Sequence, residues 1–428
     1  MTSRRDLLVT GMIAAMAPPI LSASAKLPVR PSESMEQLAR NESYWRQVAA
    51  QYDITREVVQ LENGNWGSMA LPVMAAYHQH IERVNRDNSY YARRLFNDDQ
   101  AKVRARIASS LGVAVDEIAL TRNATEALQA LIGGYAKLRP GDAVLYADLD
   151  YDAMQDGMRW LAARRGVEVV RIALPEPATY QGLIDAYAAA FKAHPNIRLT
   201  LLTHLGHRTG LVVPVKEITA LARHHNADVI LDSAHAWGQI DFRLDELGLD
   251  FAGFNAQKWI GAPLGVGIMY IRRSRLADTE PFMSDSSFPA DDIRSRVHSG
   301  TSNFAAFLTV PDALDFHEAI GVPAKESRLR YLRDQWAEAV RGHDAWEILT
   351  PTDKRLYGGL TSFRRRGRTK LDENVQLAKR LLDEARIFTV HRAGLESGAC
   401  VRVTPSVFTS LDDVEQLRKV LEGPAARW

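Results

Sequence analysis

Between residues 118 and 270 the sequence alternates short apolar runs with longer helical patterns, and this alternation limits the possible fold more than any other feature. Seven runs have the apolar composition of buried strands: 118–121, 143–146, 168–172, 199–203, 229–232, 251–254 and 266–270. Helical patterns separate the earlier runs, over 124–137, 152–165, 180–193 and 215–226. Such alternation predicts an α/β fold with a mostly parallel sheet and helices on both faces.

The periodicity changes after residue 273. A polar, proline-bearing loop over 278–296 precedes a predicted helix over 303–320 that Pro311 interrupts. Shorter elements follow, with helices predicted over 325–341, 372–385 and 411–421, and strands over 360–363, 388–390 and 400–404. This pattern indicates a smaller α+β domain that packs against the large one.

The part before residue 118 is mainly helical. Helices are predicted over 35–52, 72–86 and 98–111, with a Gly/Asn-rich turn over 61–68. We therefore predict three folded parts: an N-terminal helical segment packing with the small domain (26–60), a large domain (61–300) and a small C-terminal α+β domain (301–428).

The first 25 residues have the order of a secretory signal. The pair Arg4-Arg5 precedes an uncharged apolar run over 7–21 and then Ala23-Ser24-Ala25. The run is shorter than the roughly 20 residues of a membrane span, and Pro18-Pro19 would break a helix there. The sequence predicts export to the periplasm by the twin-arginine translocase, cleavage after Ala25 and no membrane anchor. A disordered tail is the alternative interpretation.

Charge and cysteine content exclude some classes of function. Lys plus Arg number 53 against 52 for Asp plus Glu, so net charge gives no reason to expect a nucleic-acid partner. The single cysteine, Cys400, allows neither an internal disulfide nor a cysteine-based metal cluster. Histidines at 204, 207 and 235 suggest zinc, but no HExxH spacing supports it, so we predict no metal.

An acid and a lysine follow two predicted strands. Asp232 ends the run 229–232, and Lys258 follows the run 251–254. Ligands of open α/β sheets bind at the carboxyl ends of strands. An aspartate and a lysine there suit the pyridine-nitrogen partner and the Schiff-base lysine of pyridoxal 5′-phosphate (PLP). A salt bridge between two surface loops would explain the pair equally well.

Three other positions have chemistry suited to the same cofactor. Asn123 or Thr125 would cap the helix after the first strand, where free backbone N–H groups bind phosphate. Tyr151 follows a strand and could stack on a flat ring, although core packing also explains it. Arg402, in an alternating strand, could bind a carboxylate with two hydrogen bonds or face water.

Together these motifs resemble the class V aminotransferase family of fold-type I PLP enzymes, and within it the isopenicillin N epimerase-like branch. The resemblance covers residues 61–421 and is most specific over 228–265. Exported members of this branch include an enzyme that modifies pyoverdine siderophores in the periplasm, in agreement with the N-terminal segment. The resemblance implies a fold-type I large domain with a mostly parallel seven-stranded sheet.

The resemblance also assigns roles to residues. Lys258 would form a Schiff base with PLP, Asp232 would hold the pyridine nitrogen, and His235 would contact the ring hydroxyl. Tyr151 would stack on the ring, His204 would lie near the reacting group, Asn65 would line the substrate pocket and Arg402 would bind the substrate carboxylate. The phosphate would be held by Asn123, Ala124, Thr125, Asn255, Gln257 and Thr301 of the partner subunit, which implies a homodimer.

Two positions depart from the family pattern. Gln257 stands where the family usually has His before the lysine, which puts in doubt any proton transfer assigned to that His. Relatives that remove sulfur from cysteine carry a nucleophilic cysteine on a mobile loop, whereas Cys400 lies two residues before Arg402 in a strand. We therefore interpret Cys400 as a packing residue.

The expected activity is a reaction at Cα of an α-amino acid, or of an amino-acid moiety of a larger metabolite. Lys258 would remove the Cα proton, and the sequence favours transamination. Epimerisation and C–S or β-lyase chemistry are the alternatives. A protein that keeps the fold but only binds a ligand is a further possibility, and the intact set of Asp232, Lys258 and Arg402 argues against it.

Overall fold

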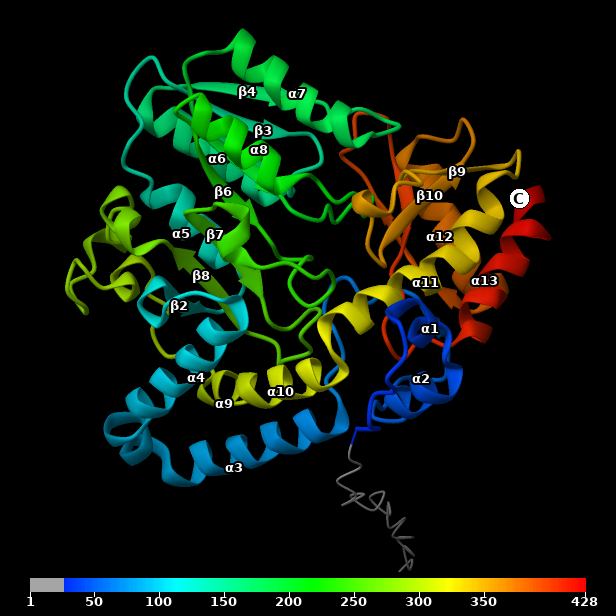
Figure 1. The fold of residues 1–428 in the computed structure, drawn as a ribbon, viewed down its shortest axis with the longest axis horizontal. Helices are drawn as coiled ribbons and strands as arrows, with labels where there is room; N and C mark the ends of the chain where they lie inside the picture. The colour runs from blue at the N-terminus through cyan, green and yellow to red at the C-terminus, as the bar shows by residue number, and fades with distance from the viewer. Residues whose placement is uncertain (1–26) are drawn as a thin grey trace, which may run out of the picture.

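The computed structural model describes residues 27–428, so the predicted signal segment lies outside the described residues. A seven-stranded sheet forms the centre of the larger part, in the spatial order β2-β8-β7-β6-β5-β3-β4 (Figure 1). Its strands are β2 (Ile118–Thr121), β3 (Ala143–Ala147), β4 (Glu168–Ile172), β5 (Ile197–Thr203), β6 (Asp228–Asp232), β7 (Phe251–Asn255) and β8 (Gly267–Ile271). Of these seven strands, only β8 runs against its neighbours. The predicted mostly parallel sheet is confirmed.

Helices cover both faces of this sheet, because side chains along each strand alternate between the faces. Along β3, Val144 and Tyr146 belong to one apolar cluster and Leu145 to another. The cluster around Val144 includes side chains of α5 (Ala124–Gly134) and α6 (Asp152–Arg165). The cluster around Leu145 includes side chains of α7 (Tyr180–Ala193) and α8 (Val215–His224). The sheet is therefore buried on both faces, and its strand ends are the part available to a ligand.

The smaller part is built on a four-stranded antiparallel sheet in the order β12-β13-β10-β9. Its strands are β9 (Trp346–Ile348), β10 (Thr361–Arg365), β12 (Val390–Arg392) and β13 (Cys400–Val403). The helices beside it are α11 (Val322–Arg341), α12 (Leu371–Ala385) and α13 (Leu411–Glu422) (Figure 1). Strand β9 has no predicted counterpart. The predicted strand 388–390 is divided between β11 (Ile387–Phe388) and β12.

The N-terminal segment lies against the smaller part. The predicted helix over 35–52 is two helices, α1 (Met35–Arg40) and α2 (Glu42–Ala49), because Asn41 ends the first and its side chain caps the second. Helix α1 packs on α11, where Arg328 donates to the carbonyl of Ala39 at 2.9 Å. Strand β1 (Val59–Gln60) pairs in parallel with β11. This arrangement places the 61–68 turn close to β13.

Four helices pack together beside the large sheet: α3 (Leu71–Arg94), α4 (Phe96–Leu111), α9 (Phe304–Leu308) and α10 (Val310–Ile320) (Figure 1). Helix α3 is longer than the predicted 72–86 and is kinked at Asn88, where φ is +46°. The predicted helix over 303–320 is divided at Thr309, because Pro311 fits only the first turn of a new helix. Among residues 27–428 there is no helix with the length and apolar composition that spanning a membrane requires.

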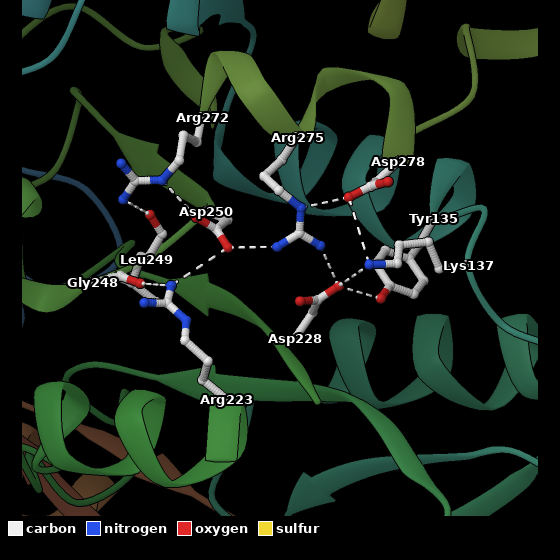
Figure 2. A network of polar contacts seen from close by, with 10 residues as sticks. All are labelled: Tyr135, Lys137, Arg223, Asp228, Gly248, Leu249, Asp250, Arg272, Arg275 and Asp278. Carbon is white, nitrogen blue, oxygen red and sulfur yellow. Dashed lines mark hydrogen bonds and ion pairs between the residues drawn. The ribbon is translucent and has the colours of Figure 1, made fainter. Parts of the chain in front are cut away.

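An ion-pair network occupies the amino ends of the central parallel strands (Figure 2). Asp228 begins β6 and Asp250 immediately precedes β7. The guanidinium of Arg275 donates to Asp228 Oδ2 and to Asp250 Oδ2, both at 2.6 Å, and Arg272 donates to Asp250 Oδ1 at 2.6 Å. Tyr135 completes the network with a 2.5 Å hydrogen bond to Asp228. Each of these carboxylates is held by cations on neighbouring elements.

Candidate active site

A cavity of about 660 Å³ lies at the carboxyl ends of the parallel strands, where the large sheet meets residues 391–394 of the smaller part. This edge is where open α/β sheets bind ligands. Eleven of the thirteen predicted site residues line it: Asn65, Asn123, Ala124, Thr125, Tyr151, Asp232, His235, Asn255, Gln257, Lys258 and Arg402. The two predicted residues outside it are His204 and Thr301.

Lys258 and His235 form the closest polar contact among the predicted side chains in the cavity. Lys258 Nζ lies 2.8 Å from His235 Nε2. Burial and the positive charge of Arg402 lower the pKa of Lys258 to about 7, which Asp232 only partly opposes. Near neutral pH a large fraction of this lysine is therefore a free amine, the form that acts as a nucleophile and a base.

Asp232 is a buried carboxylate at the end of β6. Its Oδ1 accepts a hydrogen bond from the backbone N–H of Ala234 at 2.9 Å. Burial raises the pKa of Asp232, and the Ala234 hydrogen bond and the charge of Lys258 oppose this only in part. A protonated ring nitrogen placed against this acid would supply the missing counter-charge.

The turn between β2 and α5 is preorganised for an anion. Asn123 caps α5 by accepting from the N–H of Glu126 at 2.9 Å. Asn255 Oδ1 accepts from the N–H of Ala124 at 2.8 Å and from the Gln257 side-chain amide at 3.0 Å. The hydrogen bonds from these two asparagines leave the N–H of Thr125 directed at the helix end, where anions bind.

A glycine permits this turn to lie against the sheet. A Cβ at Gly267 would come within 2.3 Å of the Asn123 backbone, so a larger residue in β8 would displace the cap. The sequence encodes the anion turn at two distant places, in the Asn-Ala-Thr motif and in the start of β8.

Arg402 enters the cavity from β13 and is 1 % exposed. It donates to Glu62 Oε1 at 2.5 Å and to the carbonyl of His207 at 2.8 Å, while its Nε has no partner among the described residues. Burial lowers the pKa of Arg402 to about 10, so the guanidinium stays charged at neutral pH. A Cβ at Gly64 would lie 2.7 Å from the guanidinium, which explains the glycine in this turn.

Tyr151 and His207 line another part of the cavity. Their rings meet edge to face, with centroids 5.2 Å apart and planes at 88°. Burial and the charge of Arg208 hold the pKa of His207 well below its usual range, so the ring is neutral. Tyr151 is 39 % exposed, as a side chain free to stack on a flat ligand would be.

The structure places His204 away from the cavity, contrary to the prediction that it lies near the reacting group. Thr203 and Leu205 line the cavity, whereas the His204 ring is buried against Phe242 with centroids 4.7 Å apart. Alternation at the end of β5 turns the side chain of residue 204 to the other face. His207, in the same loop, occupies the cavity instead.

Thr301 is exposed and does not line the cavity of its own chain. Its predicted contact with the phosphate across a subunit interface stays a prediction.

Four residues of the site were not predicted: Glu62, Asp152, His207 and Arg392. Glu62 lies in the Gly/Asn-rich turn, and Arg392 Nη2 lies 3.8 Å from its carboxylate. Asp152 pairs with the buried Arg208. The glycine-bounded loop that contains His207 was a usable signal, because two histidines there offered two candidates. No sequence pattern distinguishes Glu62 from other turn acids.

A family comparison agrees with this geometry. The model of the family described as "Aminotransferase class-V" matches residues 70–417. The chain belongs to the class V aminotransferase family. The resemblance that the sequence motifs indicated is thereby confirmed.

Relatives in this family carry several activities in their names. An isopenicillin N epimerase of Amycolatopsis lactamdurans is 26% identical over 396 residues, covering 88% of this chain and 98% of that protein. The isopenicillin N epimerase of Streptomyces clavuligerus is 26% identical over 338 residues, covering 75% and 83%. A probable cysteine desulfurase of Methanothermobacter thermautotrophicus is 24% identical over 389 residues, covering 86% and 95%.

Solved structures confirm fold type I. An apo cysteine desulfurase of Thermococcus onnurineus superposes with a TM-score of 0.76 at 18% identity, covering 89% of this chain and 98% of that one. A cystine C–S lyase in complex with its product, cysteine persulfide, gives a TM-score of 0.75 at 22% identity, covering 86% and 98%.

PLP is the cofactor of this class V enzyme, and the cavity fits it. The buried acid Asp232 has no cationic partner within hydrogen-bond reach, the lysine at 258 is partly free amine, and the α5 N-terminus offers backbone donors. These are the three groups that a pyridine nitrogen, an aldehyde and a phosphate need. Among residues 27–428 no cluster of three or more His, Cys, Asp or Glu side chains is arranged to hold a metal ion.

Proposed function

We propose that this class V enzyme removes the α-proton from an α-amino acid, or from an amino-acid moiety of a larger metabolite, with Lys258 as the proton acceptor. The observation behind this proposal is the contact between Lys258 Nζ and His235 Nε2 at 2.8 Å, in a cavity that lowers the pKa of the lysine to about 7. A base poised near neutral pH can both take and return a proton.

The other cavity residues support the same reaction. PLP supplies a ring, conjugated to the amino-acid nitrogen, that accepts the electron pair left at Cα. Asp232 would keep the ring nitrogen protonated, and Tyr151 would cover one ring face. Arg402 would orient the substrate carboxylate through its unpartnered Nε and the remaining N–H groups. The cavity of about 660 Å³ leaves space for a substrate larger than a free amino acid.

The outcome after proton removal separates three candidate activities. Transamination follows if the proton moves to the cofactor carbon, and it is the outcome the sequence favours. Epimerisation follows if a proton returns to Cα from the opposite side, and the names of two relatives support it as the second candidate. Loss of a β-substituent gives a lyase, in line with the names of the desulfurase and C–S lyase relatives.

One experiment tests the proposal and sorts these outcomes. The purified PLP-loaded protein is incubated in deuterated water with L- and D-amino acids and with short peptides that carry a free α-amino group. We expect exchange of the α-hydrogen for deuterium, read by proton NMR. Keto-acid release, inversion at Cα or sulfide release then identifies the outcome. Absence of α-hydrogen exchange with every amine would contradict the proposal.

We further propose that the protein is exported by the twin-arginine route and acts in the periplasm. The support is the Arg4-Arg5 pair followed by an apolar run and a small-residue cleavage motif at Ala25. Fractionation of cells expressing the full chain should recover a shortened protein outside the cytoplasm. Arg4→Lys together with Arg5→Lys should retain the longer form inside.

A homodimer is proposed on the same footing, with Thr301 of the partner subunit reaching the phosphate. Light scattering of the purified protein should give twice the chain mass. Thr301→Ala should weaken PLP binding without changing that mass. A monomer that binds PLP normally would contradict this arrangement.

A further inference from the structure

Trp259 joins the residue next to it, Lys258, to the histidine that contacts that lysine. The indole Nε1 of Trp259 lies 3.4 Å from His235 Nδ1. The other ring nitrogen of His235, Nε2, lies 2.8 Å from Lys258 Nζ. The imidazole therefore has a different partner on each nitrogen, and both partners belong to consecutive residues.

The chemistry of these three groups fixes the direction of both hydrogen bonds. An indole N–H can only donate, so His235 Nδ1 must accept. A neutral imidazole carries one hydrogen, which is then on Nε2 and points at Lys258. An ammonium group has no lone pair to accept that hydrogen, whereas a free amine does.

We propose that Trp259 is a positioning residue that holds His235 in the Nε2–H tautomer and thereby keeps Lys258 as an unprotonated amine. The inference deepens the proposed function, because it supplies the reason that Lys258 can act as a base. With cofactor bound, the same tautomer directs an N–H donor into the cavity. The hydrogen-bond direction itself does not depend on which reaction the enzyme performs.

The surroundings of His235 are consistent with a neutral ring. Burial, followed by the charges of Lys258 and Arg402, holds the pKa of His235 well below its usual range. Among the described residues, the ring nitrogens have no hydrogen-bond partners other than Trp259 and Lys258. An imidazolium, with hydrogens on both nitrogens, would direct one of them at the indole N–H.

The backbone around Trp259 is fixed from two sides, which gives the indole its orientation. Lys325, buried in α11, donates to the carbonyl of Trp259. On the other side, the N–H of Gly67 donates to the carbonyl of Gln257 at 2.8 Å. A Cβ at Gly67 would lie 1.9 Å from the carbonyl oxygen of Lys258, so this approach requires glycine.

The tautomer can be read directly by NMR. The chain lacking residues 1–25 is labelled with ¹⁵N-histidine, and two-bond ¹H–¹⁵N correlations are recorded with and without PLP. These correlations distinguish the Nε2–H, Nδ1–H and doubly protonated rings, and His235→Gln assigns the signal. We expect the Nε2–H pattern at neutral pH in both states. An Nδ1–H or doubly protonated ring in the unmodified protein would overturn the proposal before any variant is made.

Trp259→Phe removes the indole N–H and keeps an aromatic ring. We expect His235 to lose its single-tautomer pattern, and the cofactor-free chain to combine with PLP about tenfold more slowly at neutral pH, as a rise of about one unit in the pKa of Lys258 would cause. Trp237→Phe is the matched control, because Trp237 is also buried and its indole N–H has no partner among the described residues. An unchanged His235 signal in Trp259→Phe would overturn the inference.

The inference and the proposed function fail in distinguishable ways. If no amine undergoes α-hydrogen exchange, the proposed function fails while the NMR pattern still reports the tautomer. If exchange occurs and His235 carries its hydrogen on Nδ1, only the role of Trp259 is wrong.

Discussion

The two ends of the large sheet both carry charged side chains, and they treat these charges in opposite ways. At the amino ends of β6 and β7, Asp228 and Asp250 share the guanidinium of Arg275 with hydrogen bonds of 2.6 Å (Figure 2). At the carboxyl ends of the same strands, Asp232 has one hydrogen bond, from a backbone N–H, and Lys258 contacts a neutral histidine. The same two strands therefore join a paired charge network to an incompletely paired one.

The pKa values express this difference. Burial alone would raise the pKa of Asp228, but hydrogen bonds from Arg275 and Tyr135 bring it below its ordinary value. For Asp232, burial dominates and the pKa is raised. Charges at the amino end thus stabilise the fold, whereas those at the carboxyl end cost stability until a ligand pairs with them. This division is typical of active sites, which retain groups that the resting protein does not satisfy.

Removing the lysine should give the largest effect. In Lys258→Ala we expect turnover to fall by about 10⁴-fold or more, because the variant loses both the covalent link to PLP and the proton acceptor. The visible absorbance of the bound cofactor should change with it. The matched variant at the other end is Arg275→Met, which should lower the melting temperature and leave kcat per folded molecule in place. Loss of turnover in Arg275→Met at temperatures where it stays folded would break the comparison.

The two aspartates should change stability in opposite directions in the cofactor-free chain. Asp228→Asn should destabilise by about 3 kcal/mol at neutral pH, because it leaves Arg275 underpaired in a partly buried site. A depressed pKa gives stability that is present above the unfolded pKa of about 3.9 and is lost as pH falls. The destabilisation should therefore shrink on acidification below about pH 4. Urea unfolding measured from pH 7 to pH 3 checks both statements.

Asp232→Asn should instead stabilise the cofactor-free chain at neutral pH. A raised pKa means that the ionised form is disfavoured in the folded state, so stability is greatest at low pH and falls as pH rises through the titration. Replacing the acid removes that cost, and the gain should disappear below about pH 4. The same variant should lose turnover once PLP is added, because the ring nitrogen has lost its acid. A destabilised Asp232→Asn would show that this end of the sheet is paired in a way the contacts do not reveal.

Arg402→Lys should have a smaller effect on catalysis. A lysine retains the charge but cannot form two parallel hydrogen bonds to a carboxylate, so about 1.5–3 kcal/mol of binding is lost. This corresponds to a fall of roughly 10–100-fold in kcat/KM, expressed mainly in KM. Arg365→Lys, at the far end of β10, is the control and should leave both constants unchanged. If kcat falls and KM does not, Arg402 acts on the transition state rather than on substrate binding.

The paired arrangement of Asp232 and Lys258 could be predicted from the sequence because strand ends converge at one edge of a parallel sheet. Each strand was visible as an apolar run, so the residue after each run had a predictable location. The seven strands of the large sheet differ from the prediction by two residues at most, as in β5. Local signals also predicted the cap at Asn123, whose partner Gly267 is distant in sequence.

Other parts of the site depend on contacts that no local pattern encodes. Glu62 is defined by its hydrogen bond to Arg402, 340 residues later in the chain. His204 was chosen over His207 because a loop after a strand gives no reliable face, and one residue of shift moves a side chain out of the cavity. The break between α1 and α2 was missed because Asn41 interrupts a continuous amphipathic pattern.

The smallest predicted effect belongs to Cys400, and it decides one of the remaining chemical alternatives. The thiol is buried, its Sγ lies 3.8 Å from the carbonyl of Arg208, and burial raises its pKa to about 12. Such a thiol is not a thiolate at neutral pH and cannot attack a sulfur atom in the cavity. Cys400→Ala should therefore leave kcat/KM unchanged for every amine that the enzyme accepts, and lower stability by about 1 kcal/mol through lost packing. Sulfide release from L-cysteine, measured with and without added reductant, is the relevant assay. If the unmodified enzyme releases sulfide and Cys400→Ala does not, the thiol takes part in sulfur transfer, and residues 400–402 must be able to leave β13 during the reaction.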